Sequence, residues 1–187
     1  MATETKKTKE TVSPDSALPS HMISRRLGSV DATGALAGEL AALARRGDVI
    51  ALGGDLGCGK TTFARAFIRA LAALHGEGDA GEEVPSPTFT LVQIYDRSPA
   101  PVWHFDLYRV EKPEDAYELG IEEAFESAIS LVEWPRKLGH LLPAERLDLD
   151  LEFSDGAPPG DASGGPRMAT LTGYGAWAAR LEGLENP

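Results

Sequence analysis

Hydrophobic residues along the chain follow two spacings, and the helical spacing marks several segments. Leu36, Leu40 and Leu43 recur every three or four residues before Gly47, and the residues from Ser29 onward suit a helix N-cap. Residues 61–71 have a similar amphipathic pattern. The spacing predicts a helix at each place. Further short helices are expected at 113–119, 121–126 and 176–184.

Other stretches show the short apolar runs or the strict alternation of β-strands. The strands that these patterns predict are 48–53, 91–95, 102–108, 128–135, 147–153 and 168–172. A Pro-containing turn at 98–101 indicates that the second and third form an antiparallel hairpin. From Leu147 to Phe153 apolar and acidic residues alternate, so this strand should keep one face in water.

Two stretches lack the hydrophobic residues that a core requires. Residues 1–22 are rich in Thr, Lys, Glu, Ser and Pro, and residues 154–166 are rich in Gly, Pro, Asp, Ala and Ser. Such segments bury too little apolar surface to offset the entropy lost on ordering. We therefore expect a disordered tail at 1–22 and a single domain at 23–187 that contains a flexible loop at 154–166.

Charge and cysteine content narrow the class of protein. The 29 acidic and 18 basic residues give a formal net charge of −11. This balance disfavours a protein that clamps nucleic acid by itself, so any role near RNA should run through a partner. The single cysteine, Cys58, excludes an intrachain disulfide. Without an apolar run of membrane-spanning length or a signal-peptide core, the sequence favours a soluble, cytoplasmic protein with no membrane partner.

The main chemical motif is GDLGCGKT at residues 54–61, which fits the phosphate-binding pattern G-x-x-x-x-G-K-[ST]. Its glycines let backbone N–H groups surround a di- or triphosphate at the start of the next helix. Lys60 would reach the outer phosphates and the Thr61 hydroxyl would bind Mg²⁺. The alternative is a chance match in a glycine-rich loop. Strand, loop and helix in this order predict an α/β, P-loop NTPase-like, three-layer fold with a mixed central sheet and helices on both faces.

Two predicted strands end in carboxylates, which could provide the metal-binding part of a nucleotide site. Asp106 ends the strand 102–108 and Glu133 lies near the end of 128–135. Ligands of α/β sheets lie beyond the carboxyl ends of the strands, so both acids should face the phosphate loop and hold Mg²⁺ or its waters. Thr88, in a Pro- and hydroxyl-rich stretch, could sense the γ-phosphate as NTPase switch residues do; a plain turn is the alternative.

Several other residues have two interpretations each. Thr33 could approach the nucleotide base or only cap its helix, and Trp134 could cover the site or only pack in the core. His104 fits a packed strand residue better than a catalytic base. Cys58 fits a small loop residue better than a redox-sensitive one. Arg109 is a candidate arginine finger, with a structural role as the alternative.

Four motifs in this order resemble those of the TsaE family of small P-loop ATPases, formerly called YjeE. They are GGDLGCGKTT at 53–62, SPTFTLV at 86–92, HFDLYR at 104–109 and LVEWP at 131–135. The resemblance spans roughly residues 29–153. It implies an ATPase, using ATP and Mg²⁺, that acts with TsaB and TsaD proteins to make threonylcarbamoyladenosine in tRNA. In that system TsaD transfers the threonylcarbamoyl group, and ATP hydrolysis by the TsaE protein lets the complex turn over.

The resemblance also implies roles for matching residues. It assigns the phosphate cradle to Gly57, Cys58, Gly59, Lys60, Thr61 and Thr62. It makes Thr61 and Glu133 the Mg²⁺ ligands, Asp106 the acid that positions or activates water, and Ser86, Thr88 and Thr90 a switch. Cys58 departs from the family, which usually has alanine there, and residues 1–22 and 154–166 look like additions.

Two rival functions use the same motif. A small-molecule or protein kinase would transfer the γ-phosphate to a hydroxyl, although no distinct acceptor-binding lid is visible in the sequence. A nucleotide-gated interaction module would use bound ATP to set its affinity for a partner, with hydrolysis incidental.

Overall fold

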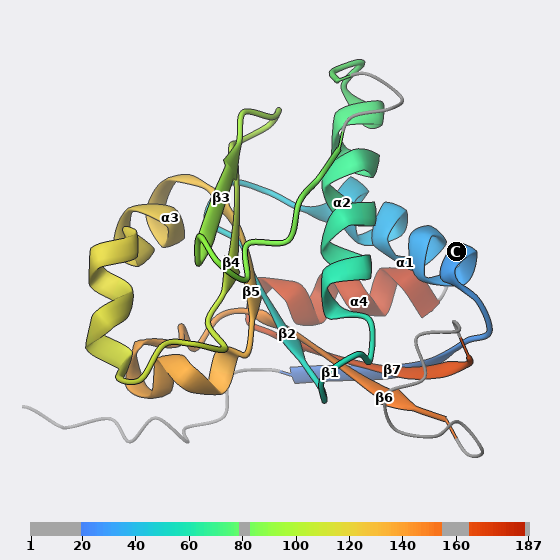
Figure 1. Cartoon of the computed structure of the whole chain (residues 1–187). Helices are drawn as coiled ribbons and strands as arrows, with labels where there is room; N and C mark the ends of the chain where they lie inside the picture. Colours follow the sequence, from blue (N-terminus) through green and yellow to red (C-terminus); the bar gives the residue numbers. More distant parts are fainter. Residues whose placement is uncertain (1–19, 79–82, 155–164, 186–187) are drawn as a thin grey trace, which may run out of the picture.

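A computed structural model describes residues 20–78, 83–154 and 165–185 of the chain (Figure 1). Its elements are, in order, β1 (Ser20–Leu27), α1 (Val30–Leu43), β2 (Val49–Gly53), α2 (Lys60–Leu74), β3 (Val92–Tyr95), β4 (Val102–Asp106), the 3₁₀ helix η1 (Pro113–Leu119), α3 (Ile121–Ser127), β5 (Ile129–Glu133), the 3₁₀ helix η2 (Pro135–Leu141), β6 (Leu147–Phe153), β7 (Arg167–Tyr174) and α4 (Ala176–Glu185).

These strands form one seven-stranded sheet in the order β1-β7-β6-β2-β5-β4-β3. The central strands β6, β2, β5 and β4 pair in parallel, while β1, β7 and β3 add antiparallel pairings. The sheet is therefore mixed, and its parallel centre brings the carboxyl ends of β2, β4 and β5 to one edge.

Helices cover the sheet on two sides, which gives three layers. In Figure 1, α1, α2 and α4 gather on one side, and α3 with the 3₁₀ helices lies on the other. The larger core cluster holds buried residues of α1, α2 and α4, including Leu40, Phe67 and Trp177. A smaller cluster around Phe105 and Val132 joins η1, α3 and η2 to the opposite face. The predicted α/β, P-loop NTPase-like fold is confirmed.

The helices beside the phosphate loop form for the reasons that the sequence indicates. Ser29 caps α1, because its Oγ accepts a hydrogen bond of 3.1 Å from the Ala32 amide. In α2 the buried residues Phe63, Phe67 and Leu71 recur every four residues, so one face of the helix packs inward. This packing holds α2, which begins at Lys60, against the sheet.

The strands differ from the sequence expectations mainly at their ends. β5 is buried along its whole length and ends at Glu133, because Trp134 adopts a left-handed conformation with φ of 60°. β6 alternates buried leucines with more exposed acids, as expected.

Two elements were not predicted. β1 begins at Ser20, within the expected tail 1–22, and pairs with β7 over all eight residues. The 3₁₀ helix η2 directly follows β5. Residues 1–19 and most of the expected loop 154–166 lie outside the described residues. Within the described ranges, no helix is long and apolar enough to cross a membrane.

Candidate nucleotide site

The loop between β2 and α2 has a backbone that requires glycine. Gly54 has a φ of 119°, and a Cβ atom there would lie 2.2 Å from the Leu151 carbonyl oxygen and 2.7 Å from the Cys58 sulfur. Gly57 has a φ of 78°, but a Cβ atom there would meet nothing within 4 Å. One glycine thus lets the loop pack closely against β6, and the other allows a left-handed turn beside open space.

Lys60 begins α2 and is almost fully buried under the loop. Its Nζ donates hydrogen bonds to the carbonyl oxygens of Gly54 (2.7 Å) and Asp55 (2.8 Å). The same ammonium lies 3.9 Å from the centroid of the Trp134 ring, as expected for a cation–π contact. Trp134 packs in turn against Tyr108, with ring centroids 5.0 Å apart. The aromatic pair therefore forms one wall around the lysine.

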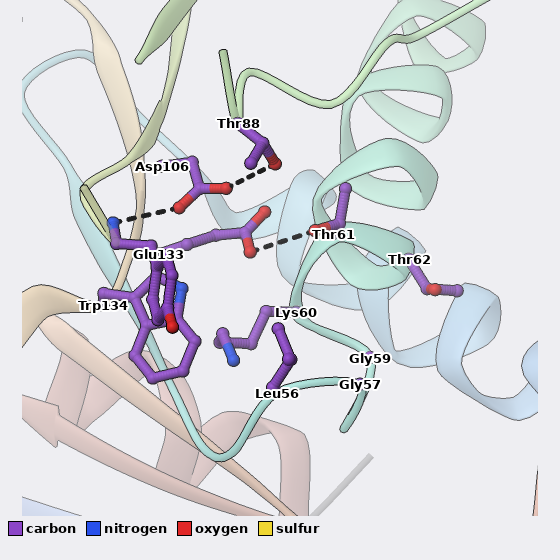
Figure 2. Close-up of a pocket in the computed structure, with 11 residues that line it drawn as sticks. Leu56, Gly57, Gly59, Lys60, Thr61, Thr62, Thr88, Asp106, Glu133 and Trp134 are labelled. Atoms are coloured by element: carbon purple, nitrogen blue, oxygen red, sulfur yellow. Dashed lines mark hydrogen bonds between the residues drawn. The ribbon is translucent and has the colours of Figure 1, made fainter. Parts of the chain in front are cut away.

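Asp106 and Glu133 lie side by side because β4 and β5 pair in parallel with these two residues in register. Both are buried. Glu133 Oε2 accepts a hydrogen bond from Thr61 Oγ1 at 3.0 Å, which joins the end of β5 to the start of α2 (Figure 2). The sequence-based expectation that both acids face the phosphate loop agrees with this arrangement.

Asp106 has hydrogen bonds to both oxygens of its carboxylate (Figure 2). Its Oδ2 accepts from Thr88 Oγ1 at 2.8 Å, and its Oδ1 accepts from the Tyr108 amide at 3.1 Å. Thr88 also shares a 2.8 Å hydrogen bond with Ser86. The hydroxyl-rich loop is therefore tied directly to this acid.

His104 is a site residue whose role the sequence did not reveal. Its imidazole is fully buried, and Nε2 lies 2.9 Å from Glu133 Oε1. An imidazole with a proton on Nε2 can donate this hydrogen bond to the Glu133 carboxylate. The available signal was its position two residues before Asp106, which places both side chains on one face of β4.

A pocket of about 200 Å³ opens where these residues meet (Figure 2). It is lined by Leu56, Gly57, Gly59, Lys60, Thr61, Thr62, Thr88, Asp106, Tyr108, Glu133 and Trp134. Within the described ranges, no three His, Cys, Asp or Glu residues cluster as metal ligands. The hydroxyl of Thr61 and the two carboxylates nevertheless form an oxygen donor set that fits Mg²⁺, which keeps several waters and binds phosphate oxygens.

Two predicted nucleotide-binding residues do not line this pocket. Thr33 lies on the buried side of α1. Its hydroxyl donates to the carbonyl oxygen of the N-cap residue Ser29 at 3.3 Å, so this hydrogen bond is made at the start of the same helix. The Cys58 side chain is buried with its sulfur 3.8 Å from Lys60 Nζ. Burial raises the pKa of the Cys58 thiol, and the nearby Lys60 charge only partly opposes this.

Arg109 is also absent from the pocket lining. It is exposed, and its guanidinium lies 5.9 Å from the ring of Phe89, a residue that is 86% exposed. Lys60 is therefore the one cation among the described residues that line the pocket.

A second cavity, of about 710 Å³, also has Trp134 in its lining. Its lining includes acids of β6 and bases from η2 and its surroundings: Arg136, Lys137, Arg146, Asp148, Asp150 and Glu152. Arg146 makes two hydrogen bonds to Asp148, of 2.7 and 3.0 Å. Partial burial raises the pKa of Asp150, and the neighbouring Asp148 charge adds to this effect.

Comparisons with known proteins point to one family. The family model described as "Threonylcarbamoyl adenosine biosynthesis protein TsaE" matches residues 27–157. A tRNA threonylcarbamoyladenosine biosynthesis protein TsaE from Rickettsia conorii is 40% identical over 129 residues, 69% of this chain and 70% of that protein. A protein of the same name from Bacillus subtilis is 40% identical over 118 residues, 63% of this chain and 69% of that protein. The crystal structure of Bacillus subtilis YdiB matches 90% of this chain and 97% of its own, with 30% identity and a TM-score of 0.68.

Proposed function

The chain belongs to the TsaE family of threonylcarbamoyladenosine biosynthesis proteins, and from this premise we propose that it binds and hydrolyses ATP in support of that tRNA modification. One observation carries the proposal. Thr61, Glu133 and Asp106 converge on a single pocket beside Lys60, and Thr61 is hydrogen-bonded to Glu133. This is the arrangement that metal-assisted phosphoryl transfer requires.

Binding of the triphosphate depends on the loop and on the first turn of α2. Backbone amides of Gly57, Cys58 and Gly59 surround the phosphates, and those of Lys60, Thr61 and Thr62 add the positive end of the helix dipole. The Lys60 ammonium binds the outer phosphates. Its burial beneath Trp134 supports this role, because a charge in a low-dielectric site interacts strongly with an anion.

Thr61 and Glu133 are the proposed Mg²⁺ ligands. When bound, the ion neutralises charge on the phosphate oxygens. The 3.0 Å contact between the two side chains supports the assignment, because it places a hydroxyl and a carboxylate at one point. His104 holds the other carboxylate oxygen and so orients the ligand, as outer partners of metal sites commonly do.

Asp106 orients the water that attacks the γ-phosphate and accepts its proton, and the bond to the β-phosphate oxygen breaks to give ADP and phosphate. Its two hydrogen bonds support this role because they fix the carboxylate. Thr88 links the acid to the loop that contains Ser86 and Thr90, so that loop acts as the switch. Its order depends on the nucleotide and on the partner.

Partners complete the reaction cycle in this proposal. With Lys60 as the one cation among the described lining residues, the isolated chain hydrolyses ATP slowly. TsaB-like and TsaD-like proteins form a complex in the cytoplasm, and ATP hydrolysis by this chain lets that complex begin another round of modification. The chain reaches tRNA only through that complex, which agrees with its net charge of −11.

One observation favours the nucleotide-gated module as a second candidate function. Phe89, in the loop that Thr88 ties to Asp106, is 86% exposed, so a change at the phosphate could alter a partner-binding surface. The hydrolysis-deficient Asp106→Ala variant distinguishes the two functions. If it supports repeated rounds of tRNA modification, hydrolysis is incidental.

The fate of the γ-phosphate tests the proposed reaction itself. The chain is incubated with Mg²⁺ and ATP labelled in the γ-phosphate, with Lys60→Ala as the control. We expect the label to appear slowly as inorganic phosphate and not to appear in the control. Transfer of label to any hydroxyl acceptor would identify a kinase instead.

A further inference from the structure

Arg167, the first residue of β7, reaches the phosphate-binding loop from the far side of β6. Its Nε donates a hydrogen bond of 3.1 Å to the carbonyl oxygen of Cys58, 109 residues earlier in the chain. Arg167 is only 8% exposed. It lies beyond residue 157, where the match to the family model ends. A buried cation is thus hydrogen-bonded to the loop backbone.

The guanidinium of Arg167 is fixed by other contacts as well. Arg167 pairs with Phe153 across β7 and β6, and its guanidinium lies 4.3 Å from the centroid of that ring. Nη1 donates to the carbonyl oxygens of Gly165 and Pro166. A planar cation that is stacked and hydrogen-bonded in this way has little freedom to turn. Its bond to the loop therefore has a defined direction.

This direction determines the orientation of one loop amide. The Cys58 carbonyl and the Gly59 N–H belong to the same planar trans peptide, so they point to opposite sides. With the carbonyl directed to Arg167, the Gly59 N–H points away from Arg167, and Gly59 lines the pocket next to Lys60 and Thr61. We infer that Arg167 is a positioning residue that holds the Gly59 N–H toward the phosphates. This inference rests on the proposed function.

The loop provides a reason for such a restraint. Gly59 has a φ of 112°, in a region that glycine enters easily, so the preceding peptide could rotate and place the Cys58 carbonyl in the pocket. A carbonyl oxygen there would repel the anion and remove one donor. The charged hydrogen bond from Arg167 stabilises the productive orientation.

Arg180 offers a matched control, because it is also a largely buried arginine that stacks on an aromatic ring. Its guanidinium lies 3.9 Å from the Trp177 ring and forms two hydrogen bonds to Asp48. Its other acceptors are the carbonyl oxygens of Leu43 and Ala176. None of these contacts involves the phosphate loop.

The experiment compares Arg167→Met with Arg180→Met in calorimetric titrations of a non-hydrolysable ATP analogue with Mg²⁺. Methionine keeps much of the length of the side chain but removes the donors. Without this donor the peptide between Cys58 and Gly59 can rotate, so Arg167→Met should weaken binding about tenfold to a hundredfold. Arg180→Met should lower the thermal midpoint but leave the affinity within about twofold of the wild type.

A spectroscopic measurement separates positioning from simple stabilisation of the fold. In ¹⁵N-labelled wild-type protein, the Gly59 amide resonance should shift strongly when the analogue binds. In Arg167→Met this shift should be much smaller, and Arg167→Lys, which keeps a charged donor, should restore both the shift and most of the affinity.

Three results would overturn the inference. Equal affinities of the wild type and a folded Arg167→Met variant would do so directly. If Arg167→Met does not fold, Arg167→Lys takes its place: a folded Arg167→Lys variant that keeps the charged donor but loses both the Gly59 shift and the affinity would also overturn it. If the wild type itself does not bind the analogue, the proposed function fails first and the inference fails with it.

Discussion

His104 Nε2 lies 2.9 Å from Glu133 Oε1, while the other oxygen of Glu133 accepts the Thr61 hydroxyl at 3.0 Å. The carboxylate is therefore held from two directions, by its neighbouring strand β4 and by the helix that follows the phosphate loop. Such a carboxylate keeps one geometry, and this geometry is what a metal ligand needs.

Removing the His104 donor should weaken Mg²⁺ binding more than nucleotide binding. His104→Leu leaves Glu133 Oε1 buried without that partner, so we expect the Mg²⁺ affinity of the nucleotide complex to fall about tenfold to a hundredfold. Mg²⁺ titration of the nucleotide-bound protein measures this. His104→Gln, which keeps an N–H donor, should lose less. If His104→Leu lost the same nucleotide affinity in the presence of Mg²⁺ and in the presence of EDTA, this would contradict the proposal that His104 acts on the metal through Glu133.

Substitutions of the neighbouring acids Glu133 and Asp106 should affect different steps, nucleotide binding and hydrolysis respectively. Glu133→Ala removes a proposed metal ligand, so Mg²⁺-dependent nucleotide binding should weaken. Asp106→Ala removes the group that orients water, so hydrolysis should slow while binding stays close to that of the wild type. Parallel binding and turnover assays on both variants provide the measurement. The opposite pattern would reverse the assignment of the two residues.

Two glycines of the loop should differ in their tolerance of alanine. Gly57→Ala introduces only left-handed strain, which costs roughly 1–2 kcal/mol of stability. Gly54→Ala adds a close contact with the Leu151 backbone, so its total cost should be roughly 2–5 kcal/mol. Urea unfolding of both variants tests this order. Similar losses at the two positions would show that the loop does not pack against β6 as described.

Stability should depend on pH through Asp150. Its pKa is raised in the folded protein, chiefly by partial burial and then by Asp148 and Glu152, against the effect of Arg136. The folded state thus favours the protonated acid. Its contribution to stability is present below the unfolded pKa of about 3.9 and is lost as the pH rises through the higher folded value.

Asp150→Asn should therefore raise the thermal midpoint at pH 7, and the gain should shrink as the pH approaches 4. Asp148→Asn is the matched control, because it removes the negative charge and one of the two oxygen acceptors for Arg146 and should lower the midpoint at pH 7. A gain for Asp150→Asn that grows on acidification would have the wrong sign for this explanation.

Local sequence patterns were sufficient to predict the strand, loop and helix at the centre of the fold. The apolar run of β2, the loop motif and the periodicity of α2 are contiguous, so their arrangement follows from neighbouring residues. Asp106 and Glu133 could be placed because acids at the ends of parallel strands meet at one edge of a sheet.

Long-range contacts explain what the sequence did not reveal. β1 contains few large apolar residues, and it is a strand because β7, far along the chain, supplies its hydrogen-bond partners. The links from His104 to Glu133 and from Arg167 to Cys58 likewise depend on strand order, which no local pattern specifies. For Thr33 the sequence left open an approach to the nucleotide base or a helix cap; in the structure Ser29 is the cap, and Thr33 is buried with its hydroxyl bonded to the Ser29 carbonyl oxygen.

The most direct test of the central claim is Mg²⁺-dependent phosphate release from ATP, measured for the chain alone and with purified TsaB-like and TsaD-like proteins. We expect slow release alone and faster release with the partners, and none from Lys60→Ala in either case. Full-rate hydrolysis by the isolated chain would contradict a partner-completed site. Tight ATP binding without stimulated release would contradict the ATPase and favour the nucleotide-gated module.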